Sequence, residues 1–385
     1  MKKLSTFVIF LVIAAGCKEK YLTPIQSPPT GYLVVEGFIN SGQSESTIRL
    51  TRTTKLYDSV NIIYEHNAAV NIIGENNEIF PLYENGNGVY ISASLHLNEN
   101  EKYRLQIKTQ DNKEYESDFA KVRHTPPIDS VTWKRDDNGL KIYVNTHDPK
   151  DSTRYYKWDY EETWEIHSPY LSTLKYVYDP TTNLVLYLDY RDPVAHNPDT
   201  TVFRCWRSSI STSINTGSSE KLSRDVIYLP ILSIEPADEK LSVLYSIRVK
   251  QYALSKDAYL FFQKIKKNTE QLGSVFDPQP SELQGNIHCI TDPKEPVVGY
   301  VDVSEEKDQR IFINNSELPG WNYRTDCMLR TLVNNPDSIN IFGMNLTPVM
   351  PVKIEQMHIV TFSAAVPACV DCTTRGTNIR PPFWP

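Results

Sequence analysis

Short runs of β-branched and aromatic residues, separated by polar turns, recur along the first third of this 385-residue chain. Tyr32–Ile39 reads YLVVEGFI, and a Ser, Gly and Asn turn separates it from Thr47–Thr53, where Ile48 and Leu50 alternate with polar residues. Such alternation is typical of strands with one buried face, so the two runs predict a β-hairpin. Further strands are expected, most of them at a spacing of roughly 8 to 12 residues, at Ala69–Ile73, Ile79–Tyr83, Val89–Ser92, Tyr103–Thr109 and Tyr115–Ala120.

This spacing of strands defines the expected domain organisation. Short strands in such a series predict an immunoglobulin-like sandwich of about seven strands over residues 31–125. Arg123–Pro127 (RHTPP) ends in a proline pair and is the expected linker. A chain of this length usually forms more than one hydrophobic core. We therefore expect a mainly β protein, in which residues 126–385 form a larger β-rich domain with one amphipathic helix.

A longer run with a period of two lies in the second domain, at Tyr155–Ile166 (YYKWDYEETWEI). One interpretation is a long strand whose aromatic face forms the inside of a sandwich, and the alternative is an exposed platform for flat sugars or peptide side chains. The area that these rings must bury favours the core. In that case Glu162 must lie near an edge or have a partner, because a buried charge is costly. The residues on this face are Tyr156, Trp158, Tyr160, Glu162 and Trp164.

The pattern changes from a strand to a helix after another alternating run, Leu241–Tyr252. Ser255 is a good N-cap and Asp257 lies in the first turn, so a helix is expected over residues 255–272. Lysines occupy its other face and indicate a solvated surface, with contact to anionic lipid as the alternative. The expected apolar stripe is Ala258, Tyr259, Phe262, Ile265 and Leu272, and the lysines are Lys264, Lys266 and Lys267.

The N-terminal residues predict the destination of the chain. A basic pair precedes a short apolar stretch, Leu4–Ala15, which leads into a box of small residues that ends at Cys17. The stretch is well short of the roughly 20 residues that span a bilayer. The pattern resembles a bacterial lipoprotein signal, with residues 1–16 as signal peptide, Cys17 as the lipid-bearing N-terminus and residues 17–30 as a proline-containing tether. We expect a protein that is anchored to a membrane by lipid without spanning it.

An exported chain meets an oxidising compartment, so the other cysteines are candidate disulfide partners. Their odd number leaves at least one free or in an intermolecular bond. For the Cys369 and Cys372 pair, a structural disulfide is favoured over a zinc site, because no second CxxC is present. It is favoured over a redox motif because such a motif opens a helix, whereas a segment rich in threonine and then proline follows here. We predict a bond from this pair to Cys327, with a local Cys369–Cys372 bond as the alternative, and docking of Phe383 and Trp384 on the second domain. The five candidates are Cys205, Cys289, Cys327, Cys369 and Cys372.

Charge and motif content argue against several functions. The chain has 40 basic and 47 acidic residues, a net charge of -7, so nucleic acid is not an expected partner. The sequence has no dinucleotide-binding, phosphate-loop, zinc-protease or nucleophile-elbow signature. Its eight histidines are scattered without the short spacing of metal ligands. We expect no enzyme activity, no metal and no cofactor.

Particular segments carry a family resemblance. They are Tyr32–Asn40, Tyr155–Glu165, Tyr245–Leu254, Asn268–Pro280 (NTEQLGSVFDPQP), Gly285–Ile287 and the tail Cys369–Trp384 (CVDCTTRGTNIRPPFW). These segments resemble the Bacteroidota lipoproteins grouped as domain of unknown function 4249. The resemblance implies an outer-membrane lipoprotein that faces the cell exterior, and a gene often found beside that of a TonB-dependent receptor. It supplies no catalytic residues.

Two functions of different class follow. In the first, the protein is a binding accessory that docks on an outer-membrane β-barrel receptor and helps it to capture or take up a substrate, a small molecule or peptide of unknown identity. In the second, it is a structural subunit of an outer-membrane protein assembly or secretion complex. The partners that copurify with the native lipoprotein distinguish the two.

Overall fold

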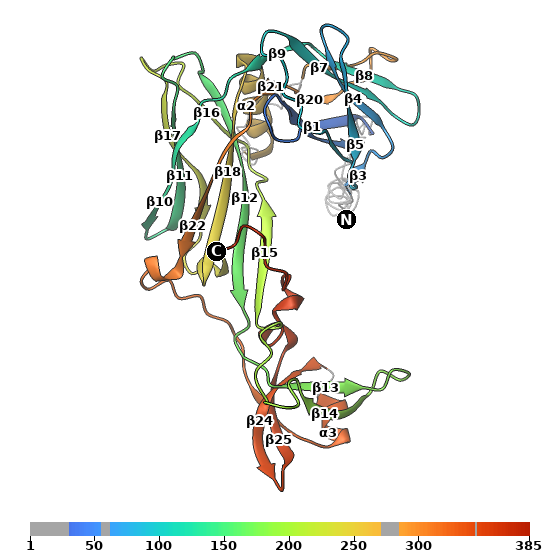
Figure 1. The fold of residues 1–385 in the computed structure, drawn as a ribbon, viewed down its shortest axis with the longest axis vertical. Helices are drawn as coiled ribbons and strands as arrows, with labels where there is room; N and C mark the ends of the chain where they lie inside the picture. The colour runs from blue at the N-terminus through green and yellow to red at the C-terminus, as the bar shows by residue number, and fades with distance from the viewer. Residues whose placement is uncertain (1–30, 55–61, 271–284, 343–344) are drawn as a thin grey trace, which may run out of the picture.

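The computed structural model describes residues 31–54, 62–270, 285–342 and 345–385. The fold is mainly β, as expected from the sequence, and the molecule is elongated (Figure 1). A β-barrel formed largely by the N-terminal strands lies beside a two-sheet sandwich at one end, and a smaller lobe forms the other end. We refer to these three parts as the barrel, the sandwich and the distal lobe.

The barrel is a ring of eight strands that closes on itself. The closing contacts are the antiparallel pairing of Tyr103 with Ala120 and the parallel pairing of Ile39 with Val303. In ring order the strands are β1 (Leu33–Asn40), β2 (Thr47–Arg52), β6 (Val89–Ile91), β5 (Ile79–Glu84), β4 (Ala69–Gly74), β7 (Lys102–Lys108), β9 (Ala120–Arg123) and β21 (Val303–Ser304). Short strands flank this ring, namely β3 (Ile63–Tyr64), β8 (Glu114–Ser117), β19 (Ile287–Cys289) and β20 (Val298–Gly299).

The barrel corrects the expectation of an immunoglobulin-like sandwich. Alternation of buried and exposed residues is the same in a sandwich and in a barrel, so the period of two does not separate them. The expected run Tyr115–Ala120 divides into the end of β8 and the start of β9, and β9 turns back to pair with β7. Three short strands from residues 287–304, within the predicted C-terminal domain, join the barrel sheet.

The sandwich buries the aromatic face that the sequence places on one long strand. Its core contains Trp158 and Tyr156, both fully buried, packed against Val144 and Ile247. The core interpretation is therefore confirmed for these rings. One sheet contains β10 (Ile128–Asp136), β11 (Gly139–His147) and β17 (Val226–Ile234), and the other contains β15 (Arg204–Ile210), β12 (Tyr155–His167), β18 (Leu244–Ala253), β22 (Lys307–Asn314) and β16 (Asn215–Ser218).

The expected linker contains a buried joint between the barrel and the sandwich, formed by Thr125 and Pro126. Thr125 is fully buried, and its hydroxyl lies 2.8 Å from that of Ser304 on β21. The backbone N–H of Ala253 on β18 donates to the Thr125 hydroxyl at 3.0 Å. The Gln251 amide donates to the Pro126 carbonyl at 2.8 Å. Because buried hydrogen bonds are costly to break, this segment fixes the two parts to each other.

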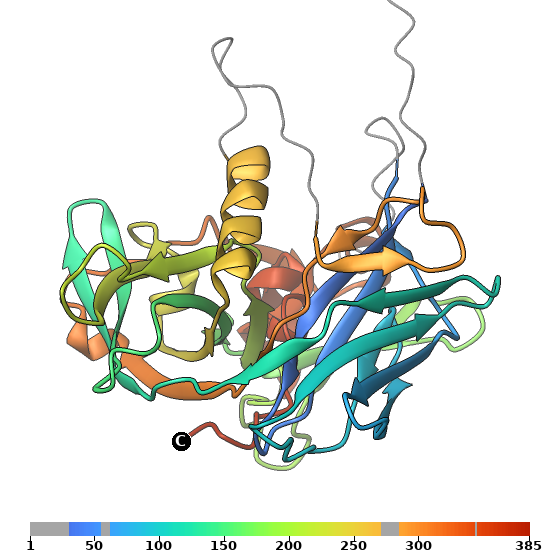
Figure 2. The ribbon, with the colours of Figure 1, turned by 90° about the horizontal axis from the view of Figure 1, so that it is seen from above.

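Helix α2 (Lys256–Glu270) lies between the barrel and the sandwich (Figure 2). Ser255 caps it as predicted, since the Ala258 N–H donates to the Ser255 hydroxyl at 3.1 Å. The expected stripe needs a correction, because the most buried ring on the helix is Phe261, whereas Phe262 is only partly buried. The predicted helix end at Leu272 lies outside the described residues.

The distal lobe consists of two excursions of the chain away from the sandwich. The first follows β12 and contains a hairpin within residues 172–201, and the second follows β22. Leu174 and Phe362, both fully buried, form the centre of its small core. Its elements are β13 (Leu174–Tyr178), β14 (Val185–Tyr190), β23 (Arg330–Val333), α3 (Pro336–Phe342), β24 (Thr347–Glu355) and β25 (His358–Ala365). The elements α3, β23, β24 and β25 were not predicted from the sequence.

Two disulfides lie where the distal lobe meets the sandwich. Cys327 bonds to Cys369, as predicted, and Cys205 bonds to Cys372. The alternative of a local bond between the two tail cysteines is therefore wrong. Cys289 is free and buried. Short 3-10 helices lie at Glu239–Leu241, Asn315–Glu317, Pro367–Cys369 and Cys372–Thr374.

Candidate functional site

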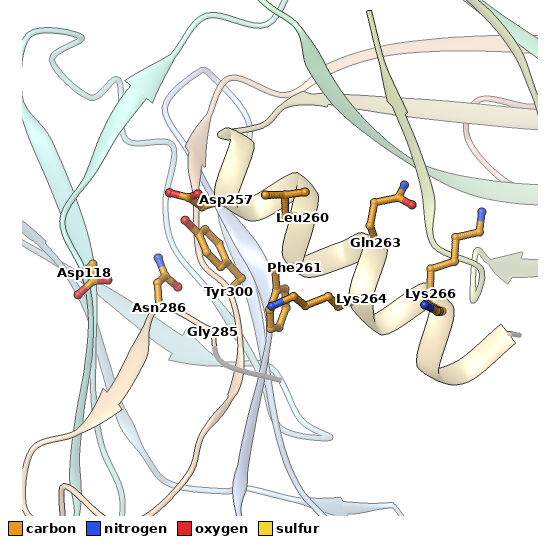
Figure 3. Close-up of a pocket in the computed structure, with 11 residues that line it drawn as sticks. Asp118, Asp257, Leu260, Phe261, Gln263, Lys264, Lys266, Gly285, Asn286 and Tyr300 are labelled. Atoms are coloured by element: carbon orange, nitrogen blue, oxygen red, sulfur yellow. The ribbon is translucent and has the colours of Figure 1, made fainter. Parts of the chain in front are cut away.

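A cleft of about 640 Å³ separates α2 from the neighbouring part of the barrel (Figure 3). Helix α2 supplies one wall, with Gln263, Lys264 and Lys266, and Asn286 and Tyr300 lie on the other side. The described lining contains no serine, cysteine or histidine side chain. The lining combines amide and ammonium groups with the carboxylates of Asp118 and Asp257.

The polar groups on the barrel side of the cleft already have partners. The Asn286 amide donates to the Val301 carbonyl at 2.8 Å and accepts from the Val301 N–H at 2.9 Å. The Tyr300 hydroxyl lies 3.4 Å from that of Ser255, and burial raises the pKa of Tyr300. On the helix wall the Gln263 amide also has a partner, since it donates to the Thr216 hydroxyl at 2.7 Å.

A second cleft, of about 500 Å³, lies at the end of the sandwich and is lined in part by Arg135, Asp136 and Trp321. Arg135 donates to the Pro319 carbonyl at 2.6 Å, and its guanidinium carbon lies 5.6 Å from the centre of the Trp321 ring. Asp136 is paired with Lys141 at 2.9 Å. These contacts close the end of the sandwich and give this cleft a structural role.

Glu162, the carboxylate that interrupts the aromatic face of β12, has the partners that the sequence analysis required. Lys240 donates to both of its oxygens at 2.9 Å, and the Tyr245 hydroxyl donates at 2.8 Å. The Ser209 hydroxyl adds a further bond at 3.0 Å. Burial, followed by the charge of Glu162, raises the pKa of Tyr245 well above its ordinary value. A carboxylate with so many donors is a structural group.

A second buried carboxylate, Glu165, holds the C-terminal tail. The Trp384 indole donates to Glu165 at 3.0 Å, and His167 and Arg204 each contact the carboxylate at 2.7 Å. Burial alone raises the pKa of Glu165, but hydrogen bonds from these three side chains lower it to about 2. Trp384 is buried, as predicted, whereas Phe383 is 42% exposed and contacts Arg310.

Exposed large apolar side chains gather on the distal lobe. Monomeric proteins rarely expose extended apolar patches without an interaction that covers them. The sequence signal that could have revealed this surface is the charge-poor run Thr347–Ile354, which the sequence analysis did not use. These side chains belong to Tyr178, Leu184, Leu186, Tyr187, Val333, Ile341, Met350, Val352, Ile354 and Met357.

The remaining predicted site residues have separate outcomes. Cys369 and Cys372 are both in disulfides, so this CxxC pair is neither a zinc site nor a redox motif in the structure. The described residues contain no group of three or more His, Cys, Asp and Glu side chains that could hold a metal ion. Cys17 and the predicted tether lie outside the described residues. None of the described helices is long and apolar enough to cross a membrane.

A model of the protein family described as domain of unknown function DUF4249 matches residues 18–310. The chain belongs to this family. The match ends before the second excursion into the distal lobe, so β23, α3, β24, β25 and the tail lie beyond it. No curated protein matches the chain.

Proposed function

We propose that this DUF4249 protein is a lipid-anchored lipoprotein of the outer membrane, facing the cell exterior, and that it acts as a binding accessory of a TonB-dependent receptor. One observation carries the proposal: exposed apolar side chains are concentrated on the distal lobe, at one end of an elongated molecule. A surface of this kind fits a protein partner. The resemblance to Bacteroidota lipoproteins supplies the class of partner, an outer-membrane β-barrel receptor.

The N-terminal sequence supports attachment by lipid at the opposite part of the molecule. The apolar stretch before Cys17 is too short to span a bilayer, and β1 of the barrel begins 16 residues after this cysteine. A segment of this length reaches at most about 55 Å when fully extended. The barrel would therefore stay near the lipid, while the distal lobe extends to meet the receptor (Figure 1).

The cleft beside α2 is the surface that we assign to solute contact. Its helix wall presents the Lys264 ammonium group on the side that faces the barrel, whereas Gln263 is bonded to Thr216 on β16. An ammonium donor favours a solute with carboxylate or other anionic oxygen groups, including the carboxylates of a peptide. Capture there would raise the local concentration of a substrate next to the receptor, without any chemical step by the accessory itself.

The deciding experiment is purification of the native lipoprotein from detergent-solubilised membranes, with identification of stoichiometric partners. A TonB-dependent receptor in the complex supports the proposal. An assembly or secretion barrel in its place supports the structural-subunit alternative. Recovery of the lipoprotein without any barrel protein contradicts both. A Cys17→Ala variant tests the anchor separately, because it should leave the membrane fraction in cells that lack the barrel partner.

A further inference from the structure

The tip of the β24–β25 hairpin departs from the residue preferences of a tight turn. Glu355 pairs with His358, so Gln356 and Met357 form a two-residue loop. Both have positive φ, 47° and 62°, which is the pattern of a type I′ turn. This turn favours Asn-Gly, because most side chains fit the left-handed region poorly. Departures from such local rules occur preferentially at functional sites.

Met357 is also the most exposed large apolar side chain among the described residues, at 96%. Val352 and Ile354 are 56% and 52% exposed on the adjoining strand. The base of the hairpin is held by Phe362, which is fully buried in the core of the distal lobe. The hairpin therefore presents an apolar tip on a fixed base, and the tip points away from the rest of the molecule (Figure 1).

The charges beside the tip favour a protein partner over a lipid surface. Lys353 and Glu355 are the hairpin's one lysine and one acidic residue, and they pair with each other at 2.6 Å. Their charges cancel, so the tip has no net attraction for anionic headgroups. A carboxylate two residues from Met357 makes entry into hydrocarbon costly. The tip also lacks the tryptophan and tyrosine side chains that favour membrane interfaces.

A second copy of this chain is a poorer match for the tip. The two clefts described above are lined by charged side chains, including Lys264 and Lys266 in one and Arg135 and Asp136 in the other. Each cleft places charged side chains next to its apolar ones, such as Leu260 and Phe261 in the first, so an entering methionine would desolvate those charges at a cost. A convex tip with three exposed apolar residues needs a concave apolar recipient, and such anchors typically occupy the centre of a protein interface.

We infer that the β24–β25 tip inserts Met357, flanked by Val352 and Ile354, into an apolar socket on the protein partner. The inference rests on the proposed function, in which that partner is an outer-membrane β-barrel receptor. It goes further by naming the docking element, which lies beyond the residues matched by the family model. The socket should be uncharged at its centre and polar at its rim, where Lys353 and Glu355 remain solvated.

The test uses a variant that improves the turn while removing the anchor. Gln356→Asn with Met357→Gly creates the preferred type I′ sequence, so the thermal midpoint should stay equal or rise. The amount of barrel partner recovered with the lipoprotein should fall about tenfold or more, as for the loss of a central anchor residue. Ile79→Thr is the matched control, because it removes a 63% exposed apolar side chain from the barrel and should leave recovery unchanged.

A photoreactive phenylalanine at position 357, in intact cells, gives an independent readout. A covalent adduct with the barrel partner supports the inference, whereas an adduct with a second copy of the chain overturns it. Equal recovery of the partner by wild type and the Asn-Gly variant also overturns it, and leaves the proposed function standing. If the wild type binds no barrel protein, the proposed function fails and this inference fails with it. Binding to phosphatidylglycerol vesicles that depends on Met357 would overturn the inference in favour of a lipid surface.

Discussion

The barrel and the distal lobe use the same β-forming residues in opposite ways. The barrel closes its main ring of strands and buries Tyr90, Tyr103 and Tyr115 almost completely. The distal lobe has a two-stranded and a three-stranded sheet, a small core and a series of exposed apolar side chains. Closure satisfies strand edges and lets one hydrophobic core stabilise the whole part. The distal lobe lacks this solution, so we expect its order to depend on covalent ties and on a partner.

The largest loss of stability should follow removal of the Cys205–Cys372 disulfide. This disulfide joins residues 167 positions apart. The chain-entropy model gives a stabilisation of about 5 kcal/mol for a loop of this length, and about 4 kcal/mol for the 42-residue separation of Cys327 and Cys369. Combining Cys205→Ser with Cys372→Ser should therefore release the tail and the distal lobe to proteolysis. Mass spectrometry of the early cleavage products locates the opened region.

The barrel provides the internal control for that experiment. None of its described strands carries a disulfide, and its one cysteine, Cys289 on β19, is free. Treatment of the native protein with reductant should reproduce early cleavage in the distal lobe and leave the described barrel strands, β1 to β9, resistant. Early cleavage within the barrel, or equal resistance of both parts, would remove the contrast between them.

The next effect concerns the helix that joins the barrel to the sandwich. Phe261 is 3% exposed and packs 5.6 Å from the Tyr300 ring. Truncating a buried phenylalanine costs about 3 to 5 kcal/mol, so Phe261→Ala should lower the free energy of unfolding by this amount. Phe262→Ala is the matched comparison and should cost less, because that ring is only partly buried. Urea denaturation measures both, and a larger loss for Phe262→Ala would contradict the observed stripe.

Sequence periodicity predicted the strands of the barrel well and its closure not at all. The runs that became β1, β2 and β4 to β7 are rich in β-forming residues, and β2 and β7 alternate clearly, so each strand can be recognised from its own residues. Closure depends on Tyr103 meeting Ala120 and on β21 returning from residue 303. Such pairings are set by tertiary packing between segments far apart in the chain, which no local pattern records.

For the candidate site as well, features set by neighbouring residues were predicted, whereas features set by distant contacts were missed. Ser255 as N-cap and a partner for Glu162 followed from local rules, because a cap and a buried charge have strict requirements. Phe261 was missed because Tyr259, Phe261 and Phe262 all lie close to the apolar side of α2, and only packing against Tyr300 selects among them. The hairpin tip was missed because Gln356 and Met357 give no turn signal.

A third and smaller loss of stability is expected at acidic pH, where the contact between Glu165 and the C-terminal tail should weaken. The pKa of Glu165 is lowered from 4.5 to about 2, so its contribution to stability is present above pH 4.5 and is lost as pH falls through 2. A shift of this size corresponds to about 3 kcal/mol. Trp384 fluorescence should report release of the tail in this window. Glu165→Gln should abolish this pH dependence, and an unchanged profile in that variant would assign it to another group.

The smallest loss of stability is expected for a substitution of Ile354 in the distal hairpin, and its comparison with a substitution of Ile72 separates the two regions most directly. Ile72 in the barrel is fully buried, whereas Ile354 in the distal hairpin is 52% exposed. Ile72→Ala should cost about 2 to 5 kcal/mol, because it leaves a cavity in a closed core. Ile354→Ser should change the free energy of unfolding by no more than about 0.5 kcal/mol, as is usual for surface positions. A loss much greater than this on urea denaturation would mean that the hairpin packs on its own molecule in solution. An isoleucine that contributes so little to folding is free to serve the contact with a partner that we propose for this hairpin.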